Sequence, residues 1–445
     1  MNDSTVSMRR RLALAAVVAF AVACPAITGT VPDDWLVADA VVAVLAIVGV
    51  AVPLPRRLRP AAQRVTLVIV STALTLAVAD TMSRIALRLW LEPGPIELYG
   101  NPYPKMPLIG RYTANVRYRA RIAGDLSRPS AFAADREVRD LVWITDAAGF
   151  RNDPALIDPA RPLDLILLGD SFGDGADTSQ EQVWATLFAT RYRLNAYNLS
   201  MVAASPWHEY VTLASELDRL RVRRGTVVVW ALFTGNDLDG GVFWPTVDLA
   251  QLPWRGALGQ LRVEVQTFRD RSPVRRAQAE LRDRKYKSTA VWRRSFVDGR
   301  SMLFLRPYVA RAHATLEMVE RHPNYAPLTT AFAATVTLAR ERGLTLAVVL
   351  IPSKEEVYAW VVDGAPPWST TAEPSALSVA IGKMAATYDV AFLDLKPAFV
   401  TESRKVFEQS GALLWWRDDT HWNERGHELA ARVVYERFVA VRSAR

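Results

Sequence analysis

Cysteine and histidine are scarce in this sequence of 445 residues, which contains one cysteine and five histidines. A single cysteine, Cys24, excludes an intrachain disulfide and a cysteine-based metal site. The histidines are scattered and do not have the spacing of metal-ligand motifs; they are His208, His313, His322, His421 and His427. We therefore expect no metal and no other cofactor.

Charge of one sign is not in large excess either, since 54 basic residues face 46 acidic ones and the net charge is +8. This mild bias suits an anionic surface or glycan, and arginine-rich helices explain it equally well. Half of the residues are hydrophobic, and the apolar residues are concentrated in the first 91 positions. A chain of this length has room for a membrane anchor and one large domain.

The amino-terminal region contains three apolar runs, at about residues 12–30, 35–53 and 64–85. Each approaches the ~20 residues that cross a bilayer. Arginines precede the first run and fill the second link, whereas the first link holds Asp33 and Asp34. The positive-inside rule then places the amino terminus in the cytoplasm and the rest of the chain outside. We expect residues 1–91 to be a three-helix anchor in a bacterial cytoplasmic (inner) membrane; a lipoprotein signal ending near Cys24 and a buried helical hairpin are less favoured alternatives.

Residues 162–445 have the rhythm of a parallel α/β domain, because short apolar runs alternate with helical segments. The predicted strands are residues 163–168, 194–199, 226–233, 345–351 and 390–394. A lead-in segment, residues 92–161, precedes them and contains one further predicted strand at 142–145. An insertion at about 240–330 is dense in arginine and predicts solvated helices, a cap over the edge of the sheet at Ser171, or a basic face toward lipid head groups or acidic glycan. The fold class is therefore α/β, with a doubly wound, five-stranded parallel sheet.

Four blocks of polar and glycine residues follow the strands or precede the last helix. They are GDSFGDG at 169–175, the segment 198–203, TGND at 234–237 and DDTHWN at 418–423. Carboxyl ends of parallel strands meet at one edge of a sheet, so residues far apart in sequence are expected to gather there. A serine hydroxyl becomes nucleophilic when an imidazole takes its proton and a carboxylate orients that imidazole.

In type and order these blocks resemble those of the SGNH (GDSL-type) hydrolase superfamily. The turn AGFRN at 148–152, IPSKEEVY at 351–358 and DTHWN at 419–423 are similar to the membrane-anchored, AlgX/AlgJ-like branch. The resemblance covers roughly residues 95–445 and implies a three-layer α/β/α fold of flavodoxin-like type.

The resemblance implies that Ser171 is the nucleophile and His421 the general base. The carboxylate is Asp418 by the DxxH spacing of the superfamily, or Asp419 by the DxH spacing of the branch, and Asp419 is preferred. The expected oxyanion donors are the Ser171 N–H, the Ala203 N–H and the Asn236 side chain.

At two positions the sequence lacks a glycine that is usual in the family. Ala203 stands where the family usually has glycine, so its donor is expected to survive provided that φ there is not positive. Thr234 replaces the first glycine of the GxND block.

Lys354 and Asp170 are the candidate contacts to an anionic or polar substrate, although a solvated lysine explains Lys354 as well.

The function expected from the resemblance is that of an extracytoplasmic serine esterase or O-acetyltransferase acting on cell-envelope polysaccharide through an acyl-serine intermediate. The expected partners are the polysaccharide or another acyl ester, the lipid bilayer and, for transfer, a separate membrane acyl-donor protein, with no nucleic acid. Two alternatives stay open: a catalytically silent SGNH-fold module for glycan binding or assembly, and an esterase of lipids or small esters.

Overall fold

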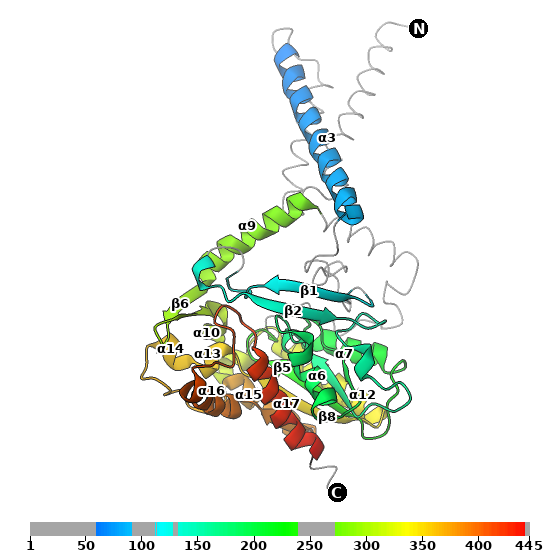
Figure 1. Ribbon diagram of the computed structural model, residues 1–445, viewed down its shortest axis with the longest axis vertical. Helices are drawn as coiled ribbons and strands as arrows, with labels where there is room; N and C mark the ends of the chain where they lie inside the picture. The colour runs from blue at the N-terminus through cyan, green and yellow to red at the C-terminus, as the bar shows by residue number, and fades with distance from the viewer. Residues whose placement is uncertain (1–58, 91–111, 113, 128–131, 239–271, 441–445) are drawn as a thin grey trace. The chain divides into compact units, whose positions relative to one another are not determined.

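The computed structural model describes residues 59–90, 112, 114–127, 132–238 and 272–440 (Figure 1). The chain divides into two units, residues 1–96 with 256–282 and residues 97–255 with 283–445. The first two predicted spans, at about 12–30 and 35–53, lie outside the described residues. A three-helix anchor therefore stays a prediction.

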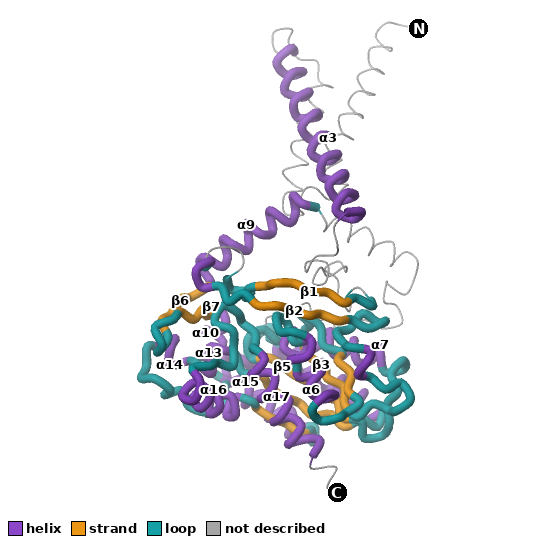
Figure 2. Tube along the Cα trace, in the orientation of Figure 1, coloured by secondary structure: helices purple, strands orange, loops and turns teal. Residues whose placement is uncertain are grey.

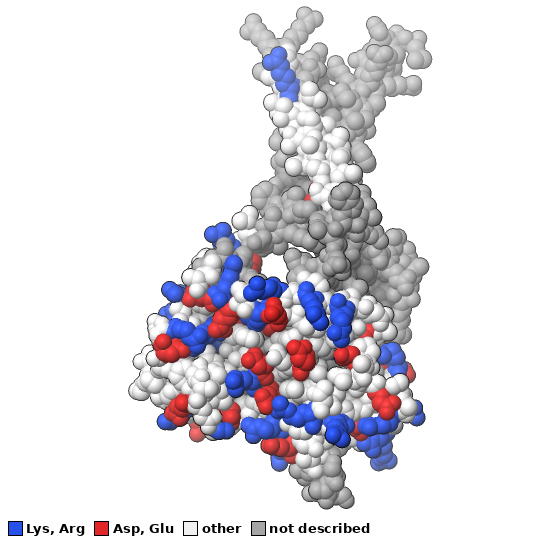
Figure 3. Space-filling view, viewed as in Figure 1, with Lys and Arg blue, Asp and Glu red and all other residues white. Residues whose placement is uncertain are grey.

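The first unit contains the long helix α3 (Arg59–Trp90), which includes the third predicted span. Within the described residues, Arg64–Ser83 is the one helical segment whose length and apolar composition suit a membrane crossing. Side chains such as Leu67 and Met82 are exposed on it. In Figure 3 the visible face of α3 carries no charge over most of its length. An exposed apolar surface of this kind is typical of a helix covered by lipid or by other helices.

The second unit is built on a five-stranded parallel sheet in the order β4-β3-β5-β8-β9. The strands are β3 (Leu165–Gly169), β4 (Ala196–Asn198), β5 (Val227–Phe233), β8 (Thr345–Ile351) and β9 (Ala391–Asp394). Each coincides with a strand predicted from the sequence. In chain order the sheet is 2-1-3-4-5, the flavodoxin-like doubly wound arrangement. The predicted α/β class with a five-stranded parallel sheet is confirmed.

Helices cover both faces of this sheet (Figure 2). Successive strand residues point to opposite faces, so Ile166 and Trp230 belong to one core while Leu167 and Val229 belong to the other. The first core includes helices α7 (Pro206–Glu216), α12 (Tyr325–Glu341) and α15 (Ala376–Thr387). The second includes α6 (Trp184–Thr190), α14 (Ala359–Asp363), α16 (Lys396–Ser410) and α17 (Glu424–Tyr435). Two layers of helices around one sheet leave the strand ends as the place for a site.

Two antiparallel hairpins lie outside the main sheet. The first pairs β1 (Arg117–Ile122) with β2 (Arg139–Ile144), and the second pairs β6 (Val291–Ser295) with β7 (Ser301–Leu305). The predicted strand at 142–145 overlaps β2, whereas β1, β6 and β7 were not predicted. The insertion also contains α9 (Pro273–Ala290), α10 (Arg306–Ala312) and α11 (Leu316–Glu320).

Candidate active site

Ser171 lies directly after β3, in the tight turn that begins the one-turn helix α5 (Ser171–Asp174). The carboxylate of Asp170 caps this helix by accepting the Phe172 N–H at 2.9 Å. Gly173 is required because a Cβ there would lie 2.2 Å from the hydroxyl of Ser200. The turn therefore fixes Ser171 at the carboxyl edge of the sheet, with its side chain 7% exposed.

His421 reaches the same point from the segment that precedes α17. Its Nε2 lies 2.9 Å from Ser171 Oγ, although 250 positions separate the two residues. Its Nδ1 lies 2.7 Å from Asp419 Oδ1, and that oxygen also accepts the His421 N–H at 2.9 Å. Serine, histidine and carboxylate thus form a continuous chain of hydrogen-bonding contacts. This is the geometry in which an imidazole can take a serine proton.

The charges around His421 favour its protonated form. Burial lowers the pKa of His421, but the hydrogen bond and charge of Asp419 and the charges of Asp125 and Asp177 outweigh it and raise the pKa to about 9. Burial likewise opposes ionisation of Asp419, yet Arg139 and His421 hold its pKa well below the usual value. Asp419 is therefore a stable anion, and His421 is a stronger base than a free imidazole.

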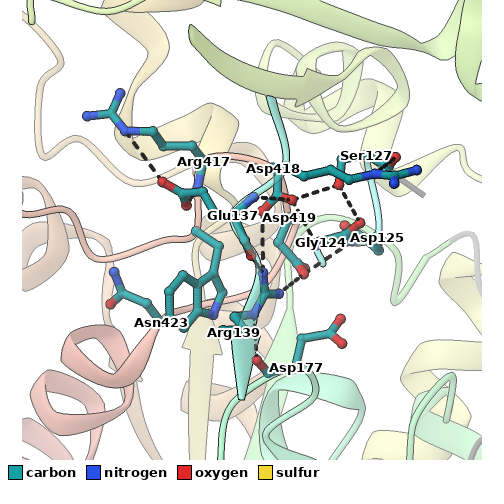
Figure 4. A network of polar contacts seen from close by, with 12 residues as sticks. Gly124, Asp125, Ser127, Glu137, Arg139, Asp177, Arg417, Asp418, Asp419 and Asn423 are labelled. Atoms are coloured by element: carbon teal, nitrogen blue, oxygen red, sulfur yellow. Dashed lines mark hydrogen bonds and ion pairs between the residues drawn. The ribbon is translucent and has the colours of Figure 1, made fainter. Parts of the chain in front are cut away.

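Asp418, the alternative acid, points away from the imidazole and toward the segment that follows β1. Its Oδ2 accepts the Gly124 N–H at 2.8 Å, the Ser127 hydroxyl at 2.6 Å and the Glu137 N–H at 3.0 Å. Figure 4 shows these contacts converging on the buried carboxylate. Of the two adjacent acids, Asp419 faces His421, and Asp418 joins residues 418–423, here called the His421 loop, to the lead-in segment.

Arg139 of β2 connects both acids (Figure 4). Its guanidinium contacts the Asp419 carboxylate and lies 3.4 Å from Asp418 Oδ1. It also donates from Nε to the Asp177 carbonyl at 3.0 Å, and it stacks 4.4 Å from the centre of the Trp416 ring. Sequence reasoning missed this residue, because nothing in the local pattern of the lead-in segment links Arg139 to a loop near the carboxyl terminus.

Lys354 is not placed to contact a substrate. Its side chain is fully buried, and Nζ donates to the carbonyls of Asp419 at 2.5 Å and of Trp416 and Arg417 at 3.4 Å. The lysine therefore supports the loop that carries Asp419 and His421 from behind. Asp170, the other candidate contact, is also fully buried and acts as the cap of α5. We correct both predictions: neither side chain has surface to offer a substrate.

The predicted oxyanion donors follow the ends of three adjacent strands, β4, β3 and β5. Ala203 lies in a turn closed by a 3.1 Å hydrogen bond from the Ala204 N–H to the Met201 carbonyl, and its φ is 61°. The condition set from the sequence, that φ is not positive, is therefore not met. The N–H is still present, because alanine keeps its backbone donor in any conformation. The residue has the left-handed backbone that glycine adopts more readily, at a cost of about 1 kcal/mol for alanine. The Ala203 N–H has no hydrogen-bond acceptor among the described residues.

Thr234, which replaces the first glycine of the GxND block, has a structural role. Thr234 Oγ1 contacts the Glu356 carboxylate and accepts the Ser353 N–H at 3.0 Å, which ties β5 to the first turn after β8. Asn236 follows two residues later and is partly buried, and its Oδ1 has no partner in the described part of the chain. The departure from glycine at 234 thus adds a connection and leaves Asn236 at the edge.

Burial raises the pKa of several acids near the strand ends. It raises the pKa of Asp237 and Glu209 well above the usual range, which favours their neutral forms. It raises the pKa of Asp170 to about 6, so this group is still mostly ionised at neutral pH. Asp237 and Glu209 therefore add little repulsion to negative charge near the strand ends.

Two further groups at the site were not singled out from the sequence. Asp125 accepts the Thr420 N–H at 2.8 Å, and Tyr308 of α10 packs edge-on against Phe233 with ring centres 5.4 Å apart. Asp125, Asp419 and His421 offer ligand atoms within 4.8 Å of one another. The two carboxylates already accept hydrogen bonds from protein donors, so the geometry does not require a cation.

The comparisons with known proteins gave one family match and similar solved structures. Residues 311–443 match the family described as SGNH hydrolase-like domain, acetyltransferase AlgX. Among solved structures, the psychrotrophic esterase EstA from Pseudoalteromonas sp., in a form inhibited by monoethylphosphonate, aligns at 10% identity with a TM-score of 0.31. That alignment covers 63% of this chain and 98% of the esterase. No curated protein matches the sequence. The residues matched by this family, 311–443, include the loop that carries Asp419 and His421 and do not include Ser171.

Proposed function

We propose that the protein is a serine acyltransferase or esterase whose acyl group passes through Ser171. The observation that carries this proposal is the continuous set of contacts from Ser171 Oγ to His421 Nε2, at 2.9 Å, and from His421 Nδ1 to Asp419 Oδ1, at 2.7 Å. A solvated surface histidine would not be expected to lie between a buried serine and a buried acid. The family match over the His421 loop supports the same chemistry.

The first half-reaction forms the acyl-enzyme. His421 Nε2 accepts the Ser171 hydroxyl proton while Oγ attacks the ester carbonyl, and the imidazolium is stabilised by Asp419. The oxyanion accepts hydrogen bonds from the Ser171 N–H, the Ala203 N–H and the Asn236 amide; loss of one such donor costs about 3 kcal/mol. The tetrahedral intermediate then collapses, and the departing alcohol takes the proton from His421.

The second half-reaction releases the acyl group. A hydroxyl group, from water or from a sugar, gives its proton to His421 and attacks the acyl carbonyl, after which Ser171 recovers its proton. Water yields an acid, and a sugar yields a new ester. We propose acetyl as the acyl group and an extracytoplasmic envelope polysaccharide as the acceptor or substrate, supported by the apolar helix α3 and by the family match. Transfer then needs a membrane partner that supplies the acyl group.

Ester hydrolysis by the full-length protein in detergent tests the proposal. A chromogenic acetate ester should be hydrolysed, and the Ser171→Ala variant should lose the activity. Ser369→Ala, a change in an exposed loop, is the matched control and should keep it. Intact-mass measurement of the quenched reaction should show one added acetyl group, absent from Ser171→Ala.

Acetyl transfer to isolated envelope polysaccharide separates the two acceptors. With an acetyl-labelled chromogenic ester as the donor, label that appears in the polysaccharide identifies a transferase. With acetyl-labelled polysaccharide as the substrate, label that is released as acetate identifies an esterase. If wild type and Ser171→Ala are equally inactive on every ester yet bind polysaccharide equally well, the protein is a glycan-binding module and the proposal is wrong.

A further inference from the structure

Residues 124–127, which follow β1, are hydrogen-bonded to the His421 loop (418–423), although almost 300 positions separate the two segments. The Gly124 N–H donates to Asp418 Oδ2 at 2.8 Å, and the Leu126 N–H donates to the Asp418 carbonyl at 3.1 Å. The approach is so close that a Cβ on Gly124 would lie 2.0 Å from that carbonyl oxygen. The segment and the loop therefore form one packed structure.

Asp125 lies at the centre of this contact. Its Oδ1 accepts the Thr420 N–H at 2.8 Å, and its Oδ2 accepts the Thr420 hydroxyl at 2.7 Å. Its own N–H donates to Asp419 Oδ2 at 3.2 Å. The Asp125 side chain thus holds Thr420, the residue between Asp419 and His421. The Asp125 backbone N–H orients Asp419 Oδ2, the oxygen that does not face the imidazole.

The carboxylate of Asp125 is also close to the imidazole. Its ligand oxygen, one from Asp419 and a ring nitrogen of His421 all lie within 4.8 Å of one another. Asp177 places a second oxygen 3.7 Å from Nδ1. The other charged or titratable groups that act on His421 are Asp170 and Asp174 around α5 and His427 of α17; Arg139 of β2 and the buried Lys354 act on Asp419.

We propose that Asp125 is a second acid of the catalytic site, a positioning residue that clamps Thr420 and adds its negative charge to the field at His421. This inference rests on the proposed function. It predicts a division of labour in which Asp419 orients the ring by direct contact, whereas Asp125 fixes the loop and increases the basicity of the ring. The charge of Asp125 is one of the causes that raise the pKa of His421. Burial and the charge of Asp419 raise the pKa of Asp125 itself, and His421 and the hydrogen bonds from Thr420 oppose that increase.

Two substitutions separate the charge of Asp125 from its hydrogen bonds. Asp125→Asn keeps an acceptor for the Thr420 N–H and removes the charge. Thr420→Val removes the hydroxyl contact and keeps the charge. Asp140→Asn is the matched control, because Asp140 belongs to the same hairpin but its side chain is 89% exposed, with only Arg121 opposite.

The readout is the pH dependence of kcat/KM for a chromogenic ester, measured on the full-length protein in detergent. In Asp125→Asn we expect the acid limb of the profile to move by about one pH unit toward acid, the usual effect of a neighbouring charge. Thr420→Val should lower kcat without moving the limb, and Asp140→Asn should match wild type. A purely structural role predicts a lower rate with an unchanged limb in both Asp125→Asn and Thr420→Val.

Histidine titration gives a second readout that needs no turnover. With only five histidines in the chain, ring-labelled protein should show a signal that disappears in His421→Gln and that titrates at lower pH in Asp125→Asn. An unchanged titration of that signal overturns the inference while leaving the proposed function intact. If Ser171→Ala hydrolyses the ester as fast as wild type, the proposed function itself fails, whatever Asp125 does.

Discussion

At the scale of single residues, the proposed mechanism makes the activation of Ser171 depend on the charges around His421. The pKa of His421 is raised from 6.5 to about 9, so the ring is mostly protonated at neutral pH. A protonated ring cannot accept the serine proton, and the reactive fraction grows as the pH rises. We predict that kcat/KM increases from neutral pH to a plateau above about pH 9. Rates corrected with Ser171→Ala for spontaneous hydrolysis test this, and a plateau already reached below pH 7 contradicts it.

The two adjacent acids predict different outcomes when each is changed. Asp419→Asn should fold normally and lose about 10⁴-fold in kcat, because the imidazole loses its orienting anion. Asp418→Ala should lower the free energy of unfolding by about 3 kcal/mol, since it leaves the Gly124 and Glu137 N–H groups without their buried acceptor and removes one of the carboxylates that contact Arg139. Denaturant unfolding and ester kinetics on both variants distinguish them. Equal losses of activity at unchanged stability would show that the assignment is wrong.

The sequence could place Ser171 and His421 at one edge of the sheet, but not the groups that support them. Ser171 and His421 sit in blocks whose residue types match a known chemistry, and their meeting follows from the parallel sheet. Lys354 has the same kind of position, just after a strand, yet its ammonium turns inward to three carbonyls. The direction of a long side chain depends on packing partners that lie 60 positions away, and no local pattern carries that information.

At the scale of elements, the turn after β4 shows how alanine occupies a glycine position. The positive φ of Ala203 destabilises the folded state by about 1 kcal/mol, and glycine would relieve this strain. Glycine would also increase the conformational entropy of the unfolded chain, which lowers stability. These effects oppose each other, so Ala203→Gly should leave stability and kcat nearly unchanged. Ala203→Val should lower both, because a branched side chain fits a positive φ poorly. Thermal unfolding and ester kinetics measure the pair; a large gain in kcat with glycine would show that alanine distorts the donor.

The sheet strands and the hairpins differ in how well the sequence predicts them. The buried strand β5 is a continuous apolar run that only a central parallel strand explains. In β1, by contrast, arginines alternate with partly buried residues, a pattern equally suited to a loop. Pairing between β1 and β2 and the contacts of the segment 124–127 stabilise that strand. The lead-in segment therefore forms part of the site, which its composition alone did not indicate.

At the scale of the whole molecule, the single cysteine offers a clean test of membrane topology. We predict that the second unit faces outward. In a Cys24→Ser background, Val297→Cys introduces a thiol in the exposed turn between β6 and β7, where the side chain is 45% exposed. A membrane-impermeant maleimide should label it in intact spheroplasts. Labelling that requires lysis of the cells would place this unit in the cytoplasm instead.

The spacing of the site along the chain has a consequence for biosynthesis. Ser171 is synthesised 250 positions before His421. On the proposed mechanism, a chain that ends before His421 therefore contains the nucleophile without its base. We predict that a stop codon at any position between 171 and 421 abolishes ester hydrolysis.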